Sequence, residues 1–183
     1  MSRKYKNKIV SCRPEHVRVA FGKNTVLDHP EPTNKQLQSD EVGYLDISGS
    51  YDGYHSFLSD SFFNGSVDGV KEAYDALNTV INKAVELMVP GAKGSEVYYN
   101  VSQILNEKYM KKSYFMGSPI GLEIHEPPIP NKHWIQPPIF GESEIQLNSV
   151  YCLIAGIHDL DKGWGIRLSE TVLVTKPECK ILT

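Results

Sequence analysis

The chain has 183 residues, of which 40% are hydrophobic and 22% charged, and its formal net charge is -3. These values are ordinary for a folded domain, and the slight acidic excess argues against nucleic-acid binding. No apolar run approaches the roughly 20 residues of a membrane-spanning helix, and residues 1–20 lack the apolar core of a signal peptide. The three cysteines are too widely spaced for a disulfide framework or a zinc ribbon. We therefore expect one cytoplasmic domain over residues 1–183, without nucleic acid or membrane as a partner.

The first third of the chain predicts three strands. Residues 17–21 (Val-Arg-Val-Ala-Phe) alternate in hydropathy as a half-buried strand does. Two further strands are expected over 42–47 and 54–63. The pair Asp52-Gly53 between them is typical of a two-residue hairpin turn, and Ser48-Gly49 is a second expected turn.

Two helices are expected next. Over residues 67–87 apolar side chains recur every three or four positions, which predicts an amphipathic helix that Pro90-Gly91 ends. Ser95 is a plausible N-cap of a second helix. The apolar face of the first helix consists of Val67, Val70, Ala73, Leu77, Val80, Ile81, Ala84 and Leu87.

The last third predicts strands again from Ile120 onward. Strands are expected over 150–157, 165–168 and 171–175, and the proline-rich stretch 127–138 predicts an ordered loop or a sheet edge. The fold class is therefore α+β, with a curved antiparallel sheet and helices on one face.

Four segments together resemble the pita-bread metallopeptidase family, which includes methionine aminopeptidase, aminopeptidase P, prolidase and the metal-free enzyme creatinase. Their order and spacing agree with the family from about Val19 to the C-terminus. The segments are Gly22-Lys23-Asn24 leading to His29-Pro30, Leu45 to Tyr54, Gly121 to Pro128, and Gly163 to Thr175.

The resemblance implies a site for two divalent metals held by two aspartates, a histidine and two glutamates. Only the first aspartate is present, as Asp46. Phe57, Ser118, Ile154 and Ser169 occupy the other four places. Glu170 is one position beyond Ser169 and is expected to face the opposite side of its strand. One carboxylate does not hold two hard cations, so we expect no metal and no other cofactor.

Residues that handle the substrate in this family are retained. His29 and His125 match its two substrate-side histidines, Glu126 follows His125 as in the family, and Arg167 matches an arginine that meets a substrate carboxylate in prolidase-like members. The resemblance thus implies His29, His125, Asp46 and Glu126 as catalytic residues. The expected substrate-binding residues are Arg167, Phe57, Ser118, Ile154, Ser169 and Tyr54.

Structural interpretations compete with these roles. His29 is alternatively a loop histidine bonded to a carbonyl, and Phe57 and Ile154 are alternatively core filling rather than an apolar substrate pocket. Asp46 either pairs with a histidine or arginine, acts as an acid of raised pKa, or is satisfied by the turn at Ser48-Gly49.

The resemblance also implies a helix pair before Gly22 that residues 1–21 do not encode. The sheet face that this pair would cover is expected to be apolar and bare, which predicts a homodimer whose partner copy covers it.

Two functions remain open. The first is a metal-independent enzyme, similar to creatinase, that carries out hydrolysis, elimination or isomerisation on a small amino-acid-like or peptide-like molecule. The second is a catalytically inactive module that binds such a ligand or a partner. An enzyme should bring His29, His125 and Asp46 together in an open pocket, whereas in the inactive module Phe57 and Ile154 should fill it.

Overall fold

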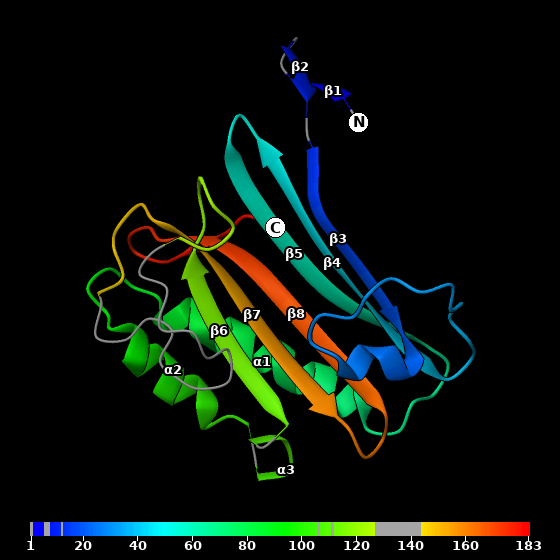
Figure 1. Ribbon diagram of the computed structural model, residues 1–183. Helices are drawn as coiled ribbons and strands as arrows, with labels where there is room; N and C mark the ends of the chain where they lie inside the picture. Colours follow the sequence, from blue (N-terminus) through cyan, green and yellow to red (C-terminus); the bar gives the residue numbers. More distant parts are fainter. Residues whose placement is uncertain (1, 6–7, 12, 106, 111, 127–143) are drawn as a thin grey trace.

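The computed structural model describes residues 2–5, 8–11, 13–105, 107–110, 112–126 and 144–183 (Figure 1). Its strands are β1 (Ser2–Tyr5), β2 (Lys8–Ser11), β3 (Arg13–Phe21), β4 (Glu41–Tyr51), β5 (Tyr54–Asn64), β6 (Ser113–Pro119), β7 (Val150–Asp159), β8 (Trp164–Leu173) and β9 (Lys180–Ile181). Its helices are the 3-10 helix η1 (Gly22–Val26) and the α-helices α1 (Val70–Leu87), α2 (Gly94–Ser102) and α3 (Glu107–Met110).

The strands form two main antiparallel sheets, with orders β3-β4-β5 and β6-β7-β8-β9, and β1 and β2 pair separately. Figure 1 shows the two main sheets side by side, with β5 next to β8, and shows α1 and α2 behind the second sheet. The expected α+β class, an antiparallel sheet with helices on one face, is confirmed.

Serine hydroxyls join the two sheets along the line where β5 meets β8. The Ser61 hydroxyl donates to the Arg167 carbonyl and accepts from the Arg167 N–H, both at 2.8 Å. The Ser59 N–H donates to Ser169 Oγ at 2.6 Å. These side-chain bonds take the place of a backbone ladder, and they bring the site-side residues of both sheets together.

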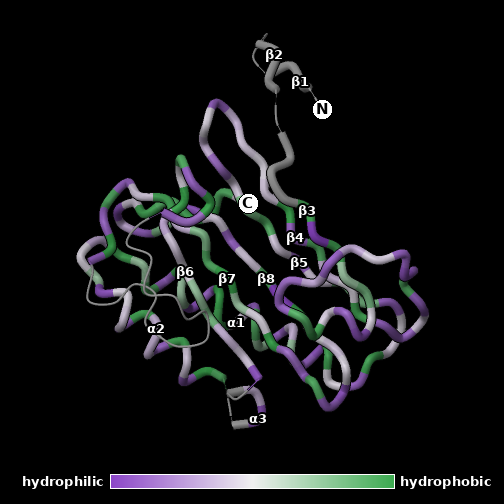
Figure 2. Tube along the Cα trace, in the orientation of Figure 1, coloured by the Kyte–Doolittle hydropathy of each residue, from purple (hydrophilic) through white to green (hydrophobic). Residues whose placement is uncertain are grey.

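Helix α1 covers the second sheet with the apolar face that the sequence predicts. Six of its expected residues are buried, and they share one core with residues of β7 and β8. The hydropathy colouring shows the apolar stretch of β7 in front of this helix (Figure 2). No helix in the described ranges is both long and apolar enough to cross a membrane. The buried residues of α1 are Val70, Ala73, Leu77, Val80, Ile81 and Ala84.

The first sheet has an outer face that no described helix covers. Pairing places Val17 opposite Ile47, and Ile47 opposite Leu58, so these side chains form one row across the sheet. Together with Val19 and Phe62 they are between 36% and 53% exposed. An exposed apolar face, as the sequence predicts, is therefore present among the described residues.

The predicted Asp52-Gly53 hairpin is confirmed. Both residues have positive φ, 52° and 84°, as a two-residue turn between twisted strands requires. The other turn, at Ser48-Gly49, is wrong, because both residues are strand residues of β4. They pair in regular register with β5, and on the other side they pair with β3 where that strand has a register shift.

Three other boundaries differ from the prediction. The strand expected from Ile120 lies before it, at Ser113–Pro119, and the strands expected over 165–168 and 171–175 form one strand, β8. Helix α2 begins at Gly94, with Lys93 in the N-cap position instead of Ser95. The hydropathy pattern of a segment indicates whether it is a helix or a strand. The ends of that element also depend on its partner strands, which the local pattern does not reveal. The proline-rich stretch 127–138 lies outside the described residues.

Candidate active site

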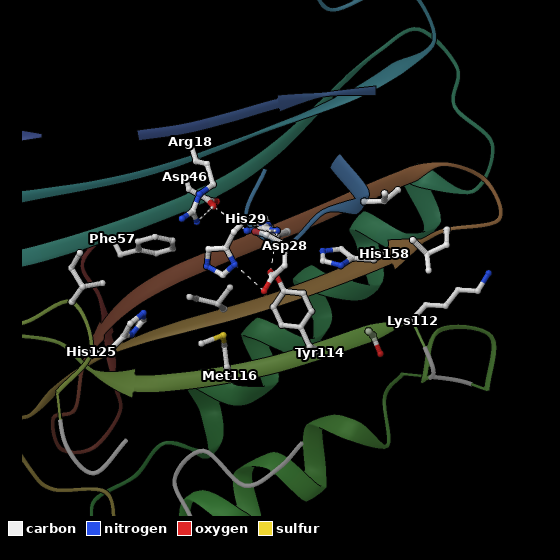
Figure 3. A pocket seen from close by; sticks show the side chains of 16 residues that line it. Arg18, Asp28, His29, Asp46, Phe57, Lys112, Tyr114, Met116, His125 and His158 are labelled. Carbon is white, nitrogen blue, oxygen red and sulfur yellow. Dashed lines mark hydrogen bonds and ion pairs between the residues drawn. The ribbon is translucent and has the colours of Figure 1, made fainter. Parts of the chain in front are cut away.

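A cavity of about 580 Å³ opens on the concave side of the two sheets (Figure 3). Its walls come from strands of both sheets and from the segments after η1 and β6. One part is apolar, with Val26, Phe57, Met116, Ile124, Ile154 and Leu160. The other part is polar, with Arg18, Asp28, His29, Asp46, Lys112, Ser113, Tyr114, His125, His158 and Arg167. Phe57 and Ile154 line the cavity rather than fill it.

Asp46 is fully buried, and its charge is balanced by two arginines. Its Oδ2 accepts from Arg167 Nη1 at 2.9 Å and lies 3.7 Å from Arg18 Nη1. Its Oδ1 accepts from the Ser59 hydroxyl at 2.5 Å. Of the alternatives for Asp46, the structure favours pairing with arginine. Both carboxylate oxygens are thus engaged by protein donors, which leaves Asp46 poorly placed to exchange protons with a substrate.

The Arg167 guanidinium lies between two carboxylates and is occupied by the protein. Its Nη2 donates to the Asp28 carbonyl at 2.9 Å and lies 3.3 Å from Asp28 Oδ1. Its plane covers the Tyr44 ring at 4.1 Å from the ring centroid. Arg167 therefore shapes the cavity wall through its two terminal nitrogens, while its buried Nε has no hydrogen-bond partner among the described residues. Its role as the clamp for a substrate anion stays a prediction.

Arg167 and Tyr44 also fix the segment that presents His29. Burial raises the pKa of Tyr44 to about 12, so its phenol stays protonated and donates to the Leu27 carbonyl at 3.1 Å. Further upstream, the buried Thr25 hydroxyl donates to the Gly22 carbonyl at 2.6 Å and accepts from the Gly165 N–H at 2.8 Å. Helix η1 is thereby attached to β8, and residues 27–29 follow it into the cavity.

His29 is paired with Asp28, the residue before it. The distance from His29 Nδ1 to Asp28 Oδ2 is 3.2 Å, and both side chains are about half exposed, at 51% and 48%. A carboxylate on Nδ1 orients the imidazole and stabilises the imidazolium that forms when the ring takes up a proton. Figure 3 shows the His29 ring reaching into the cavity with Asp28 beside it.

His125 enters the same cavity from the segment after β6 (Figure 3). Its Nδ1 lies 2.8 Å from Ser118 Oγ, so a place that the resemblance assigns to a metal-binding histidine holds a serine that orients His125. Burial lowers the pKa of His125, and the nearby His29 lowers it further. The ring is consequently neutral at pH 7.

Ser118 and three other predicted residues lie outside the cavity lining. The Glu126 carboxylate accepts from the Leu122 N–H at 2.6 Å and holds the loop that carries His125. Ser169 accepts from the backbone of Ser59 in the line between the sheets. Tyr54 is 64% exposed at the end of the β4–β5 hairpin. Glu126 and Ser169 thus support the site from behind, and Tyr54 is remote from it.

The sequence alone did not single out Asp28, Arg18 and Tyr114 as site residues, and it placed His158 only near the pocket rim, as a packing residue. His158 packs edge-to-face on Tyr114 with ring centroids 5.4 Å apart, and its buried Nε2 has no hydrogen-bond partner among the described residues. A signal existed for Arg18 and His158. Arg18 lies on the same side of its strand as the buried Ala20, and His158 lies on the same side of its strand as Ile154. A polar side chain on the inward side of a strand is a signal for a site residue.

Gly165, in the last of the four family-like segments, is required by this packing. A Cβ at this position would lie 2.1 Å from the Thr25 carbonyl oxygen and 3.1 Å from His158 Cδ2. We expect Gly165→Ala to separate η1 from β8 and so to displace the Asp28–His29 pair. The overpacking should lower the unfolding free energy by about 1–3 kcal/mol. Turnover measures the first effect and urea unfolding the second. A variant with unchanged midpoint and turnover would contradict the contact.

The donor set does not fit two metal ions. Around Asp46, two of the other metal-ligand places hold the cavity-lining side chains Phe57 and Ile154, and two hold serines whose oxygens bond to His125 and to the Ser59 backbone. Across the described residues, no group of three or more histidine, cysteine, aspartate or glutamate side chains is arranged to hold a metal ion. The Arg167 guanidinium supplies the positive charge that Asp46 would otherwise find in a metal. Glu170 bonds to the Thr183 hydroxyl instead of facing the site.

Comparisons with known proteins agree on one lineage. The chain is 28% identical over 169 residues to an Xaa-Pro dipeptidase of Pyrococcus horikoshii, covering 90% of this chain and 46% of the relative. It is 25% identical over 177 residues to the chloroplastic methionine aminopeptidase 1B of Arabidopsis thaliana, covering 87% and 47%. It thus spans about half the length of these relatives.

Solved structures lead to the same group. The prolidase from Pyrococcus furiosus superposes with a TM-score of 0.80 at 26% identity, over 93% of this chain and 49% of that one. The X-Pro aminopeptidase from Thermotoga maritima superposes with a TM-score of 0.78 at 25% identity, over 91% and 46%. The fold is therefore the pita-bread fold of these enzymes. The sequence profile of metallopeptidase family M24 matches residues 3–176, and the chain belongs to that family.

Proposed function

We propose that the cavity is a metal-independent acid–base site that hydrolyses a small amino-acid-like or peptide-like substrate. The observation that carries this proposal is that one charged group of the cavity is paired within the protein, while the histidines remain open to a ligand. Asp46 is neutralised by arginine, while the Asp28–His29 pair and the neutral His125 face an open cavity. Similar proteins are named as a dipeptidase and an aminopeptidase, and these names support a peptide-like substrate.

In this mechanism His29 is the general base. It takes a proton from the attacking water and later returns it to the leaving group, while Asp28 stabilises the imidazolium between these steps. His125, held by Ser118, donates a hydrogen bond to the carbonyl oxygen that becomes negative in the transition state. The apolar wall of Phe57, Met116 and Ile154 excludes water and packs against the substrate side chain.

The direct test is turnover in the presence of a chelator. Purified protein, freed of metal and checked by elemental analysis, is assayed against a panel of dipeptides, including Xaa-Pro peptides, by release of free amino acid. Activity that survives excess EDTA supports the proposal. Activity that appears only after manganese, cobalt or zinc is added overturns metal independence. Ligand binding without any turnover would instead favour an inactive binding module.

The buried histidines set an expected pH dependence of stability. Burial lowers the pKa of His125, and it lowers the pKa of His158 with Arg167 adding to the effect. The unfolded chain, where histidine titrates near 6.5, therefore binds more protons than the folded chain below that pH. The stabilisation is complete above about pH 6.5 and is lost as the pH falls through the folded pKa values.

This dependence is measurable as the urea midpoint at several pH values between 5 and 8. The double variant His125→Gln, His158→Gln removes both groups, and its midpoint should fall less steeply with acid than that of the parent chain. A variant whose midpoint falls as steeply as the parent's would show that neither imidazole resists protonation in the fold.

We also propose that the protein is a homodimer whose outer sheet faces meet. The row of Val17, Ile47 and Leu58 is apolar and uncharged, so a two-fold pairing centred on it places like against like, with the exposed Asp60 of the next row at its margin. Light scattering at micromolar concentration should give twice the chain mass, and Ile47→Glu should shift it to the single-chain mass. A single-chain mass for the unmodified protein would overturn this pairing.

The compartment that we propose is the cytoplasm. Cys152 is buried and Cys179 is half-buried, and both are unpaired thiols. Burial raises the pKa of each thiol, which keeps them protonated and slow to oxidise. Thiols of this kind fit a reducing environment.

A further inference from the structure

Arg18 is a cation of the cavity with unused hydrogen-bonding capacity. Its side chain is only 20% exposed, and it lines the cavity from β3. Within the described part of the chain, its guanidinium approaches one acceptor, Asp46 Oδ2, at 3.7 Å. That distance is longer than a hydrogen bond. A guanidinium carries five N–H donors, and a mostly buried charge without hydrogen bonds is unfavourable unless a ligand supplies them.

The terminal nitrogens of the other cavity cations already have protein partners, and among the described residues only the buried Nε of Arg167 is left without one. Arg167 lies between Asp46 and Asp28, whereas Arg18 has a carboxylate on one side only. Lys112, at the far end of the cavity, contacts Asp159 at 2.9 Å and Asp161 at 2.8 Å. Asp46 in turn has short contacts with Arg167 and Ser59 and does not depend on Arg18. Arg18 thus ends a row of alternating charges, with its remaining donors directed to the cavity.

We propose that Arg18 binds the anionic group of the substrate and that this group is a carboxylate. The proposal rests on the proposed function in taking the cavity as the substrate site. A single guanidinium offers one positive charge and a planar pair of donors, which match a planar monoanion. The cavity is also lined by Phe57, Met116 and Ile154, which favour an apolar body on the same molecule. The substrate class is a small carboxylate with an apolar side chain, such as a dipeptide with a free C-terminus.

Calorimetric binding tests this without relying on turnover. The probes are Ala-Pro, Leu-Pro and Phe-Pro, each compared with its C-terminal amide, at constant ionic strength. Free carboxylates should bind the unmodified chain roughly 10- to 100-fold more tightly than amides, as a charge-assisted hydrogen bond predicts. Arg18→Gln should lose that preference, and Arg18→Lys should keep part of it.

The control variant is Lys71→Met, which removes one positive charge from the exposed face of α1 and should leave binding unchanged. The thermal midpoint of each variant shows that it is folded, and Arg18→Lys keeps a cation beside Asp46 if the glutamine variant unfolds. The inference is overturned if amides bind as well as carboxylates, if none of the carboxylates binds, or if both Arg18 variants bind like the parent. Inorganic phosphate that binds through Arg18 more tightly than any carboxylate would also overturn the substrate class.

The two proposals fail in different ways. If the acid–base mechanism is wrong but the anion site is right, His29→Ala and the parent chain show the same turnover, while the carboxylate preference still depends on Arg18. If the anion site is wrong but the mechanism is right, turnover depends on His29, and Arg18→Gln changes KM for carboxylate and amide substrates equally.

Discussion

Replacing Asp46 with asparagine should destabilise the protein by about 3–5 kcal/mol, because it leaves buried guanidinium charge without its counter-charge. Asp46 is fully buried and holds Arg167 Nη1 at 2.9 Å. The amide is nearly the same size, so the loss reflects charge and not a cavity. Urea unfolding at pH 7.5, followed by tryptophan fluorescence and circular dichroism, measures the change in unfolding free energy.

The matched control for this substitution is Asp75→Asn. Asp75 pairs with Lys71 on the exposed surface of α1, and such pairs contribute less than about 1 kcal/mol. Adding Arg167→Met to Asp46→Asn should recover part of the loss, because the unpaired cation is then removed as well. If Asp46→Asn were as stable as Asp75→Asn, the arginine pairing would not be what balances this carboxylate.

Replacing His29 with alanine should lower kcat by roughly 10²–10⁴-fold, the usual contribution of a positioned general base. Because the side chain is about half exposed and its ion pair with Asp28 is at the cavity surface, the unfolding free energy should change little. The measurement is initial-rate kinetics on the best substrate of the dipeptide panel, together with the thermal midpoint of the same preparation.

Two comparisons make this test specific. Asp28→Asn keeps the imidazole but removes the carboxylate at its Nδ1, so it should lower kcat by less than His29→Ala does. Lys71→Met changes charge on the far side of the sheet and should leave kcat as it is. Unchanged kcat in a folded His29→Ala protein would remove His29 from the mechanism.

The sequence predicted those parts of the fold that repeat locally. The apolar stripe of residues 67–87 recurs every three or four positions, so it identified α1 without any knowledge of its partners. The Asp52-Gly53 turn was found because two successive residues with positive φ favour these side chains. By contrast, Ser48-Gly49 was predicted as a turn although it is strand, because its pairing partners are in β3 and β5 and do not show in the local pattern.

The site, too, was predictable where the information is local in the sequence. His29, His125, Asp46, Phe57, Ile154 and Arg167 were named from motif spacing, and the structure places all of them around one cavity. Pairing of Asp46 with an arginine was one of the alternatives raised from the sequence, and the contact with Arg167 agrees with it. The contact of Gly165 with Thr25 was not foreseen, because it joins residues far apart in the sequence. Sequence reasoning therefore identified which residues gather at the site, but not that Asp28 orients His29 or that Glu126 holds a loop.

The ion pair between Arg167 and Asp46 has a consequence for how the site is assembled. A guanidinium on β8 is attached to the backbone and is present in a ratio of one to one from the moment of synthesis. It does not dissociate, it is not exchanged for a competing ion, and its position is set by the same strand pairing that closes the sheet. The ion pair at the centre of the cavity is thereby formed by folding itself.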